Sequence, residues 1–223
     1  MSFAAPKNLL GRLDPRPMVR AVEDWWFDIT RHVETAGNAR KPPASDVVGE
    51  VRDSYIYAPV PARNARAVLR DLPVKDFSEY TFVDLGSGKG KMLFVAAEYP
   101  FRRVVGVEFA IALHQLAQRN IARFRPRRRP SPVLESVLAN AAEYDFPAGK
   151  LVVYLFNPFG PDILGRVLDN LERSLEREPR HVAVVMLWPE HSGVAARRPW
   201  LQESRKTRRS HIFETAGPPA RGR

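Results

Sequence analysis

The sequence predicts an α/β fold, with a doubly wound, mostly parallel seven-stranded sheet and an N-terminal helical extension. The first observation is a turn with glycine at every second position over residues 86–90, between an apolar segment at 82–85 and a helical pattern at 92–97. The second is a further apolar segment that ends in an acid, Glu108. The third is the continuous apolar run 151–156, which is typical of a central parallel strand. Strands that alternate with helices indicate a parallel sheet.

The N-terminal extension is predicted from residues 1–35. Residues 1–16 contain Pro, Asn and Gly and are expected to be irregular, whereas residues 17–35 have the spacing of an amphipathic helix. We expect its apolar face to pack on the main domain or to form a lid over the site. Its polar face is acidic, which argues against a helix lying on a membrane surface. The apolar positions are Val19, Val22, Trp26, Ile29 and Val33, and the acidic positions are Glu23, Asp24, Asp28 and Glu34.

The later elements follow in alternation after a loop over residues 37–45. The pattern predicts three domain-level parts: the extension over 1–46, a main domain over 47–216 and a frayed tail over 217–223. The other expected elements are helices over 62–70, 111–124 and 161–175, strands over 133–138, 151–156 and 181–188, and a terminal antiparallel hairpin over 200–206 and 210–215.

The glycine-rich turn predicts a nucleoside site at the ends of the first two strands. Glycine lets the backbone approach a ligand closely, because no Cβ intervenes. The spacing is G-x-G-x-G, whereas a dinucleotide site has G-x-G-x-x-G, and Asp84 before the turn would repel a pyrophosphate. These features disfavour a nicotinamide oxidoreductase. A P-loop is disfavoured because Met92 stands where that motif has Ser or Thr. A carboxylate at Asp84 suits a ligand with an ammonium and a sulfonium, such as S-adenosylmethionine (SAM).

Residues 84–90 and the Val107-Glu108 pair resemble the first two motifs of class I SAM-dependent methyltransferases, and the resemblance extends from about residue 47 to 215. It implies SAM as the cofactor. It implies that Asp84, Gly86, Gly88 and Gly90 hold the methionine portion, that Glu108 binds the ribose hydroxyls and that Asn140 bonds the adenine amine. Such enzymes often have an acid near Asn140, so Glu143 and Asp145 in the same loop remain alternatives.

The order of a Gly-Glu pair at 49–50, a Tyr-x-Pro segment, a helix and the 84–88 motif resembles the non-SET histone lysine methyltransferases and their bacterial relatives. This resemblance makes Glu50 a candidate to hold the SAM ammonium, and the alternative is an exposed acid in a loop. Asn157 opens the segment Asn-Pro-Phe-Gly, which partly resembles the Asn-Pro-Pro-aromatic motif of nucleic-acid amino methyltransferases and partly the lysine family. Both imply a nitrogen acceptor held by Asn157, although Asn-Pro also opens many turns.

The expected function is methyl transfer from SAM to nitrogen, with a protein lysine favoured as the acceptor. A small-molecule or nucleic-acid methyltransferase and a SAM-binding protein without turnover remain alternatives. A lysine acceptor must lose a proton, and the sequence leaves the base open among Tyr55, Tyr57, Glu190 and His191.

Composition narrows the class of protein. The chain has 223 residues, a net charge of +10 and no cysteine, which excludes disulfides and thiolate metal sites, and its histidines lack metal-binding spacing. Basic clusters at 123–130 and 205–209 make nucleic acid a possible partner, but without interleaved aromatics it is not favoured. No run of eighteen apolar residues and no signal peptide is present, so we expect a cytoplasmic protein with no membrane partner.

Overall fold

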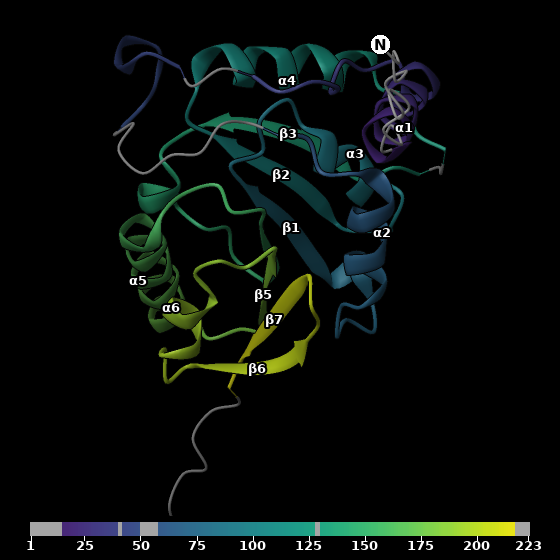
Figure 1. Cartoon of the computed structure of the whole chain (residues 1–223). Helices are drawn as coiled ribbons and strands as arrows, with labels where there is room; N and C mark the ends of the chain where they lie inside the picture. The colour runs from purple at the N-terminus through teal and green to yellow at the C-terminus, as the bar shows by residue number, and fades with distance from the viewer. Residues whose placement is uncertain (1–14, 40–41, 50–57, 128–129, 217–223) are drawn as a thin grey trace, which may run out of the picture.

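The structure, a computed structural model, describes residues 15–39, 42–49, 58–127 and 130–216. Seven strands form one sheet in the order β3-β2-β1-β4-β5-β7-β6 (Figure 1). The strands β1 to β5 run parallel, and β7 lies antiparallel between β5 and β6. This architecture confirms the predicted fold class. The strands are β1 (Tyr80–Leu85), β2 (Arg103–Glu108), β3 (Val133–Leu138), β4 (Lys150–Leu155), β5 (Val182–Leu187), β6 (Leu201–Lys206) and β7 (Ser210–Thr215).

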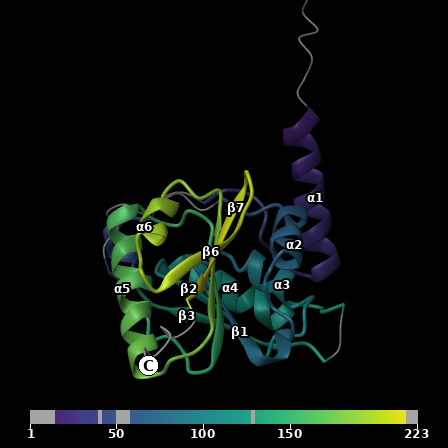
Figure 2. The same ribbon diagram turned by 90° about the horizontal axis from the view of Figure 1, so that it is seen from below.

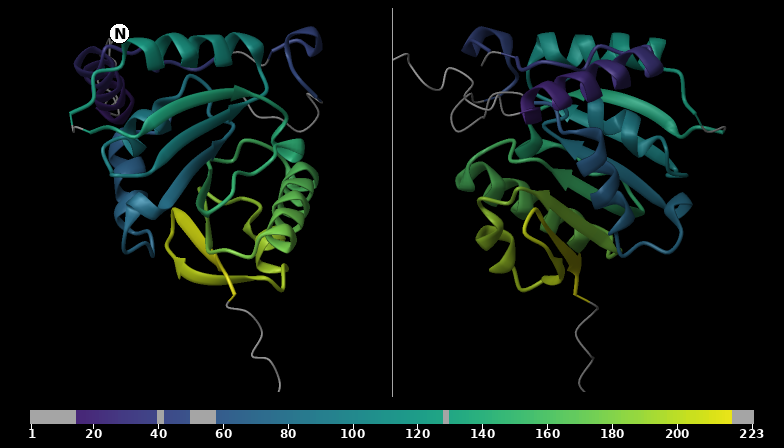
Figure 3. Two further views of the ribbon diagram at one scale, coloured as in Figure 1. Left: turned by 180° about the vertical axis from the view of Figure 1, so that it is seen from behind. Right: turned by 45° about the vertical axis from the view of Figure 1, so that its right-hand side comes forward.

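Helices cover both faces of the sheet. On one face α1, α2 and α3 share an apolar cluster with alternate side chains of the strands, and on the other α5 and α6 share the second cluster (Figures 1 and 3). The helix α4 packs against β3 and β2. The helices are α1 (Pro15–Arg31), α2 (Ala62–Arg70), α3 (Lys91–Ala96), α4 (Ile111–Arg123), α5 (Pro161–Arg177) and α6 (Ser192–Ala196), with short 3-10 turns at Ala44–Asp46, Phe77–Glu79 and Ala141–Glu143.

The strand order reverses between β1 and β4, which lie side by side although they are far apart in the chain. The crossovers leave these two strands in opposite directions, so a crevice opens at their carboxyl ends. Asp84 and Tyr154 are register partners there, and their side chains therefore emerge on the same face of the sheet. This point of the fold places the site.

The predicted packing of the N-terminal helix is wrong in its orientation. Val19, Val22, Trp26 and Ile29 are exposed, and only Val33, beyond the end of α1, packs against the core. The face turned to the body instead carries Asp24, Phe27 and Arg31, all buried. Figure 2 shows α1 alongside α2. The physical reason is that the body offers charged partners to this face: Lys91 pairs with Asp24, and Glu98 pairs with Arg31. In the part of the chain that is described, no helix combines the length and apolar character that crossing a membrane requires.

Candidate functional site

The glycine-rich turn joins β1 to α3, and its glycines adopt the left-handed conformation that glycine permits. Gly86, Gly88 and Gly90 have φ of +79°, +56° and +88°. A Cβ on Gly86 would lie 2.4 Å from the Cβ of Pro158, a distance that real Cβ atoms do not show. The turn is held to β2, because the amides of Gly86 and Ser87 both donate to the carbonyl of Val107, at 2.9 and 3.1 Å. The loop after β4 therefore packs directly on the glycines.

Glu108 ends β2 and is 3% exposed. Its Oε2 accepts a hydrogen bond from the amide of Gly88 at 2.7 Å, and its Oε1 accepts one from the amide of Ala110 at 2.9 Å. Burial raises the pKa of Glu108, and these backbone donors oppose that rise. Each carboxylate oxygen retains lone-pair capacity for a further donor. Glu108 thus fixes the turn and still presents acceptors to a ligand.

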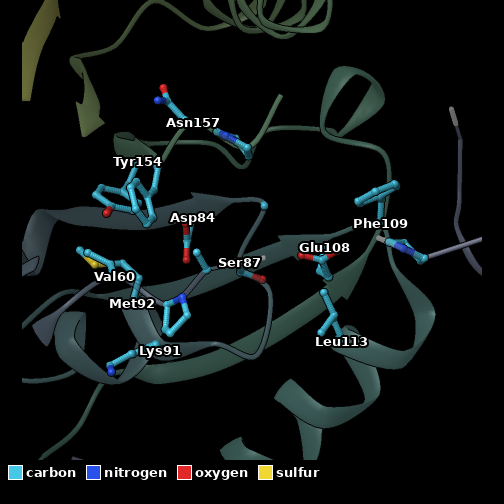
Figure 4. A pocket seen from close by; sticks show the side chains of 16 residues that line it. Val60, Asp84, Ser87, Lys91, Met92, Glu108, Phe109, Leu113, Tyr154 and Asn157 are labelled. Atoms are coloured by element: carbon cyan, nitrogen blue, oxygen red, sulfur yellow. The ribbon is translucent and has the colours of Figure 1, made fainter. Parts of the chain in front are cut away.

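Asp84 lies at the end of β1 and is 4% exposed. Burial raises its pKa well above the usual range, and the neighbouring charge of Glu108 adds to the rise. The hydroxyl of Tyr154 on β4 is also buried and has no hydrogen-bond partner among the described residues. Burial, and then the charge of Asp84, raise the pKa of Tyr154 well above its usual range. Figure 4 shows Asp84 between Tyr154 and Glu108.

One cleft brings the central predicted residues together. Asp84, Gly86, Glu108 and Asn157 line a space of about 710 Å³ that is partly open to solvent (Figure 4). Gly88 joins them through its hydrogen bond to Glu108, and Gly90 precedes the first residue of α3. The other residues that line the cleft are Pro42, Ala58, Pro59, Val60, Ser87, Lys91, Met92, Phe109, Leu113, Tyr154, Phe156 and Pro158.

Asn140 lines a second, adjoining pocket, which shares Gly86, Phe109 and Pro158 with the first. Its side chain is already engaged, because Oδ1 accepts from the amide of Ala142 at 3.1 Å and Nδ2 donates to Glu143 at 3.1 Å. A Cβ on Gly49 would lie 2.9 Å from Asn140 Nδ2, so Gly49 packs directly against this side chain. The alternatives named for this position are exposed: Glu143 also pairs with Arg166, and Asp145 pairs with Arg177.

Asn157 follows β4 and has a φ of +39°, which is uncommon for a residue with a side chain. Asn tolerates this region better than most residues. Such strain is found at functional sites, where the surrounding structure maintains it. His191, one of the predicted candidate bases, shares a small pocket with Asn157 and Pro158. Glu50, Tyr55 and Tyr57 lie outside the described residues.

Sequence reasoning missed Tyr154, Ser87 and the buried Lys91. The hydroxyls of Tyr154 and Ser87 have no hydrogen-bond partner within the described ranges, yet both residues line the cleft. Tyr154 is the only polar side chain in the apolar run 151–156, which was the available signal. Nothing in the sequence indicates that Lys91 pairs with Asp24, because 67 residues separate them.

The polar groups that line the cleft have the chemistry to bind SAM. The cleft offers a carboxyl for a cation at Asp84, spare acceptors for hydroxyls at Glu108, and two buried hydroxyls without partners at Ser87 and Tyr154. A buried polar group without a partner is costly, and a bound ligand would satisfy it.

Comparison with known proteins supports the fold. No protein-family model matches the chain, and no curated protein shows significant sequence similarity to it. TrmN from Thermus thermophilus superposes with a TM-score of 0.52 at 17% identity, over 70% of this chain and 49% of that one. A predicted N6-adenine-specific DNA methylase from Listeria monocytogenes superposes with a TM-score of 0.51 at 14% identity, over 72% of this chain and 52% of that one. The PH0226 protein from Pyrococcus horikoshii OT3 superposes with a TM-score of 0.50 at 17% identity, over 69% and 89%.

The chain spans about half the length of the first two of these structures. Identities this low show the fold alone: the chain shares the α/β fold of these structures, in agreement with the fold class that the sequence predicts.

Proposed function

We propose that this protein is a SAM-dependent methyltransferase that acts on a nitrogen acceptor. The observation that carries the proposal is the pair of buried carboxyls, Asp84 and Glu108, on either side of a turn of left-handed glycines. A cation-binding carboxyl beside a hydroxyl-binding one matches the ammonium and ribose of SAM. It does not match a pyrophosphate, which two carboxyls would repel.

Glu108 has the chemistry to hold the ribose. The amides of Gly88 and Ala110 orient its carboxylate, and each oxygen has capacity for one further donor. Asn140 is the candidate for the adenine amine in the adjoining pocket, where the second lone pair of Oδ1 remains available. Glu50 stays a candidate for the ammonium on the sequence resemblance alone.

Asp84 is the proposed partner of the cationic part. Its raised pKa favours the neutral carboxyl in the unliganded protein, and a bound cation favours the carboxylate. Binding therefore releases a proton at pH values below the raised pKa. We expect the affinity for SAM to fall as the pH is lowered through the raised pKa of Asp84, because protonation of this carboxyl then competes with ligand binding.

Asn157 is the proposed acceptor-binding residue. SAM, when bound, supplies an electrophilic methyl group. The amide oxygen of Asn157 can accept a hydrogen bond from an amine and so direct the nitrogen lone pair into the cleft. Orientation of this kind can contribute up to roughly 7–11 kcal/mol to the rate of a well-aligned reaction. His191 shares the small pocket with Asn157 and is the candidate to take the proton from a lysine acceptor.

A protein lysine is the favoured acceptor, because the order of the Gly-Glu pair at 49–50 and the motif at 84–88 resembles that of the non-SET lysine methyltransferases. The exocyclic amine of a nucleic-acid base is the second candidate. It is supported by the Asn-Pro pair at 157–158, by the net charge of +10 and by the likeness in fold to the Listeria DNA methylase.

Calorimetry with SAM, S-adenosylhomocysteine and NADH tests the cofactor. We expect binding of the first two and none of NADH. Glu108→Gln should weaken SAM binding at least tenfold. A glutamine side chain has a single acceptor oxygen, and its NH₂ group would face the amide of Gly88 or of Ala110, which is also a donor. Glu176→Gln, an exposed acid on α5, is the matched control. Equal SAM affinity in both variants contradicts the site.

Transfer of a labelled methyl group to unmodified protein, to RNA and to DNA tests the acceptor. Asn157→Gly should keep SAM binding and lose at least tenfold in the rate of transfer, since glycine tolerates the positive φ and removes the acceptor contact. Label in lysine supports the favoured acceptor, and label in a base amine supports the second. SAM binding without transfer to any acceptor supports a binding protein.

A further inference from the structure

The outer face of α1 is apolar and exposed. Of the seven large apolar side chains that are exposed among the described residues, five belong to this helix. Their exposed fractions range from 47% at Val19 to 59% at Trp26, and the two indole rings lie 6.5 Å apart between centroids. Contiguous apolar surface of this kind marks an interaction site. The face, called the α1 outer face below, consists of Val19, Val22, Trp25, Trp26 and Ile29.

The acids of α1 do not lie free on this face. Asp24 is buried against Lys91, and Glu23 pairs with Arg63 of α2 at 3.1 Å. Asp28 accepts hydrogen bonds from the amides of Thr35 and Ala36 at 2.7 and 2.8 Å. The acidic polar face that argued against a membrane surface is largely neutralised in the structure, because Glu23, Asp24 and Asp28 all have partners, and the exposed Glu34 lies beyond the end of α1.

Cations lie at the carboxyl end of the same helix. The amide of Arg125, in the loop after α4, donates to the carbonyl of Arg31 at 3.0 Å, and Figure 2 shows this loop beside the end of α1. Arg123, Arg125 and Arg127 are exposed there. Burial lowers the pKa of Arg31, the hydrogen bond and the charge of Glu98 oppose this, and the nearby charge of Arg127 adds a smaller lowering. The exposed arginines of this loop therefore lie beside the carboxyl end of the helix that carries the apolar face.

We propose that the α1 outer face and the arginine loop after α4 dock on the surface of a lipid bilayer that contains anionic lipids. Indole and aliphatic side chains partition into the boundary between headgroups and acyl chains, and the arginines meet lipid phosphates. A nucleic acid would use the arginines but leave Val19, Val22 and Ile29 in water. A second copy would cover the apolar face without using the arginines. The bilayer surface is the partner that satisfies both features.

Flotation with lipid vesicles tests the proposal on the full chain. Vesicles of phosphatidylcholine alone are compared with vesicles of equal parts phosphatidylcholine and phosphatidylglycerol, at low and at high salt. We expect binding to the anionic vesicles only, weakening as salt screens the arginines. Tryptophan emission should shift to shorter wavelength on binding, since Trp25 and Trp26 leave water.

Two pairs of variants separate the contributions. Trp25→Gln with Ile29→Gln should weaken vesicle binding at least tenfold, and the matched control is Val133→Gln, an exposed apolar residue of β3 outside the face (66% exposed). Arg123→Gln with Arg125→Gln should weaken it about thirtyfold, at roughly fivefold per arginine. Its control removes equal charge from the exposed β6–β7 turn, by Arg208→Gln with Arg209→Gln.

All the substituted side chains are exposed, so we expect the variants to be as stable as the parent, and urea unfolding checks this. Absence of vesicle binding overturns the proposal, and so does binding that survives loss of Trp25 and Ile29. A concentration-dependent dimer that the Trp25 and Ile29 variant disperses, without vesicle binding, assigns the face to a second copy and also overturns it. Vesicle binding that both controls retain and both test variants lose supports the proposal whether or not the protein transfers methyl groups.

Discussion

The close contact between the glycine turn and the loop after β4 predicts a large effect of Gly86→Ala. Gly86 has a φ of +79°, and a Cβ there would lie 2.4 Å from the Cβ of Pro158. The neighbour is part of a ring rather than the end of a flexible side chain, so the backbone must move by about 1 Å to restore ordinary contact. The movement is transmitted to Asn157, the preceding residue. The substitution should therefore affect both stability and the proposed acceptor position.

Two other glycines supply matched controls. Gly149 has a φ of +81° and open space around its Cβ position, and Gly90 has a φ of +88° with contacts no closer than 3.4 Å. Alanine at either should cost only the left-handed strain, about 1–2 kcal/mol. Alanine at Gly86 adds overpacking of about 1–3 kcal/mol, for a total of about 2–5 kcal/mol.

The assay is urea unfolding of the three alanine variants, with SAM binding by calorimetry beside it. We expect Gly149→Ala to keep the parent's SAM affinity and Gly86→Ala to lose at least tenfold. Equal unfolding free energies for Gly86→Ala and Gly149→Ala would refute the reasoning, because the contact with Pro158 would then contribute nothing.

Three further substitutions test the charges around the site. Asp84→Asn should stabilise the unliganded protein at neutral pH while weakening SAM binding. The raised pKa of Asp84 gives stability that is full below the unfolded pKa and is lost as pH rises through the folded pKa, so the gap between parent and variant in urea unfolding should widen with pH. Glu98→Gln should cost about 1–3 kcal/mol at neutral pH. Burial alone would raise the pKa of Glu98, but its two arginine partners lower it overall. The contribution of Glu98 to the free energy of unfolding is therefore present above the pKa of the unfolded chain and is lost as the pH falls through the pKa of the folded protein. A cost of Glu98→Gln that does not shrink in acid would contradict this. Lys91→Met should destabilise the protein by about 3–5 kcal/mol, because it removes one partner of a buried ion pair, and a smaller loss in thermal or urea unfolding would contradict this.

The sequence by itself determined the sheet and the glycine-rich turn, because their signals are local. The glycines at 86, 88 and 90 adopt left-handed φ that other residues avoid, and residues 151–155 of the apolar run are buried, as expected for a central parallel strand. The predicted strand 133–138 and helix 62–70 match β3 and α2 at both ends. Asp84, Gly86, Glu108 and Asn157 meet in one cleft because parallel strands end at one edge of the sheet.

Only the tertiary structure decided which face of α1 is buried. Amphipathic spacing shows that the helix has an apolar face, but the packed face is chosen by partners distant in sequence. Lys91 and Glu98 draw Asp24 and Arg31 inward, and the indoles of Trp25 and Trp26 are left outside. The same holds for Tyr154, whose hydroxyl became part of the site only when β4 was placed beside β1. Contacts between residues far apart in the chain leave no local pattern in the sequence, so only the tertiary structure reveals them.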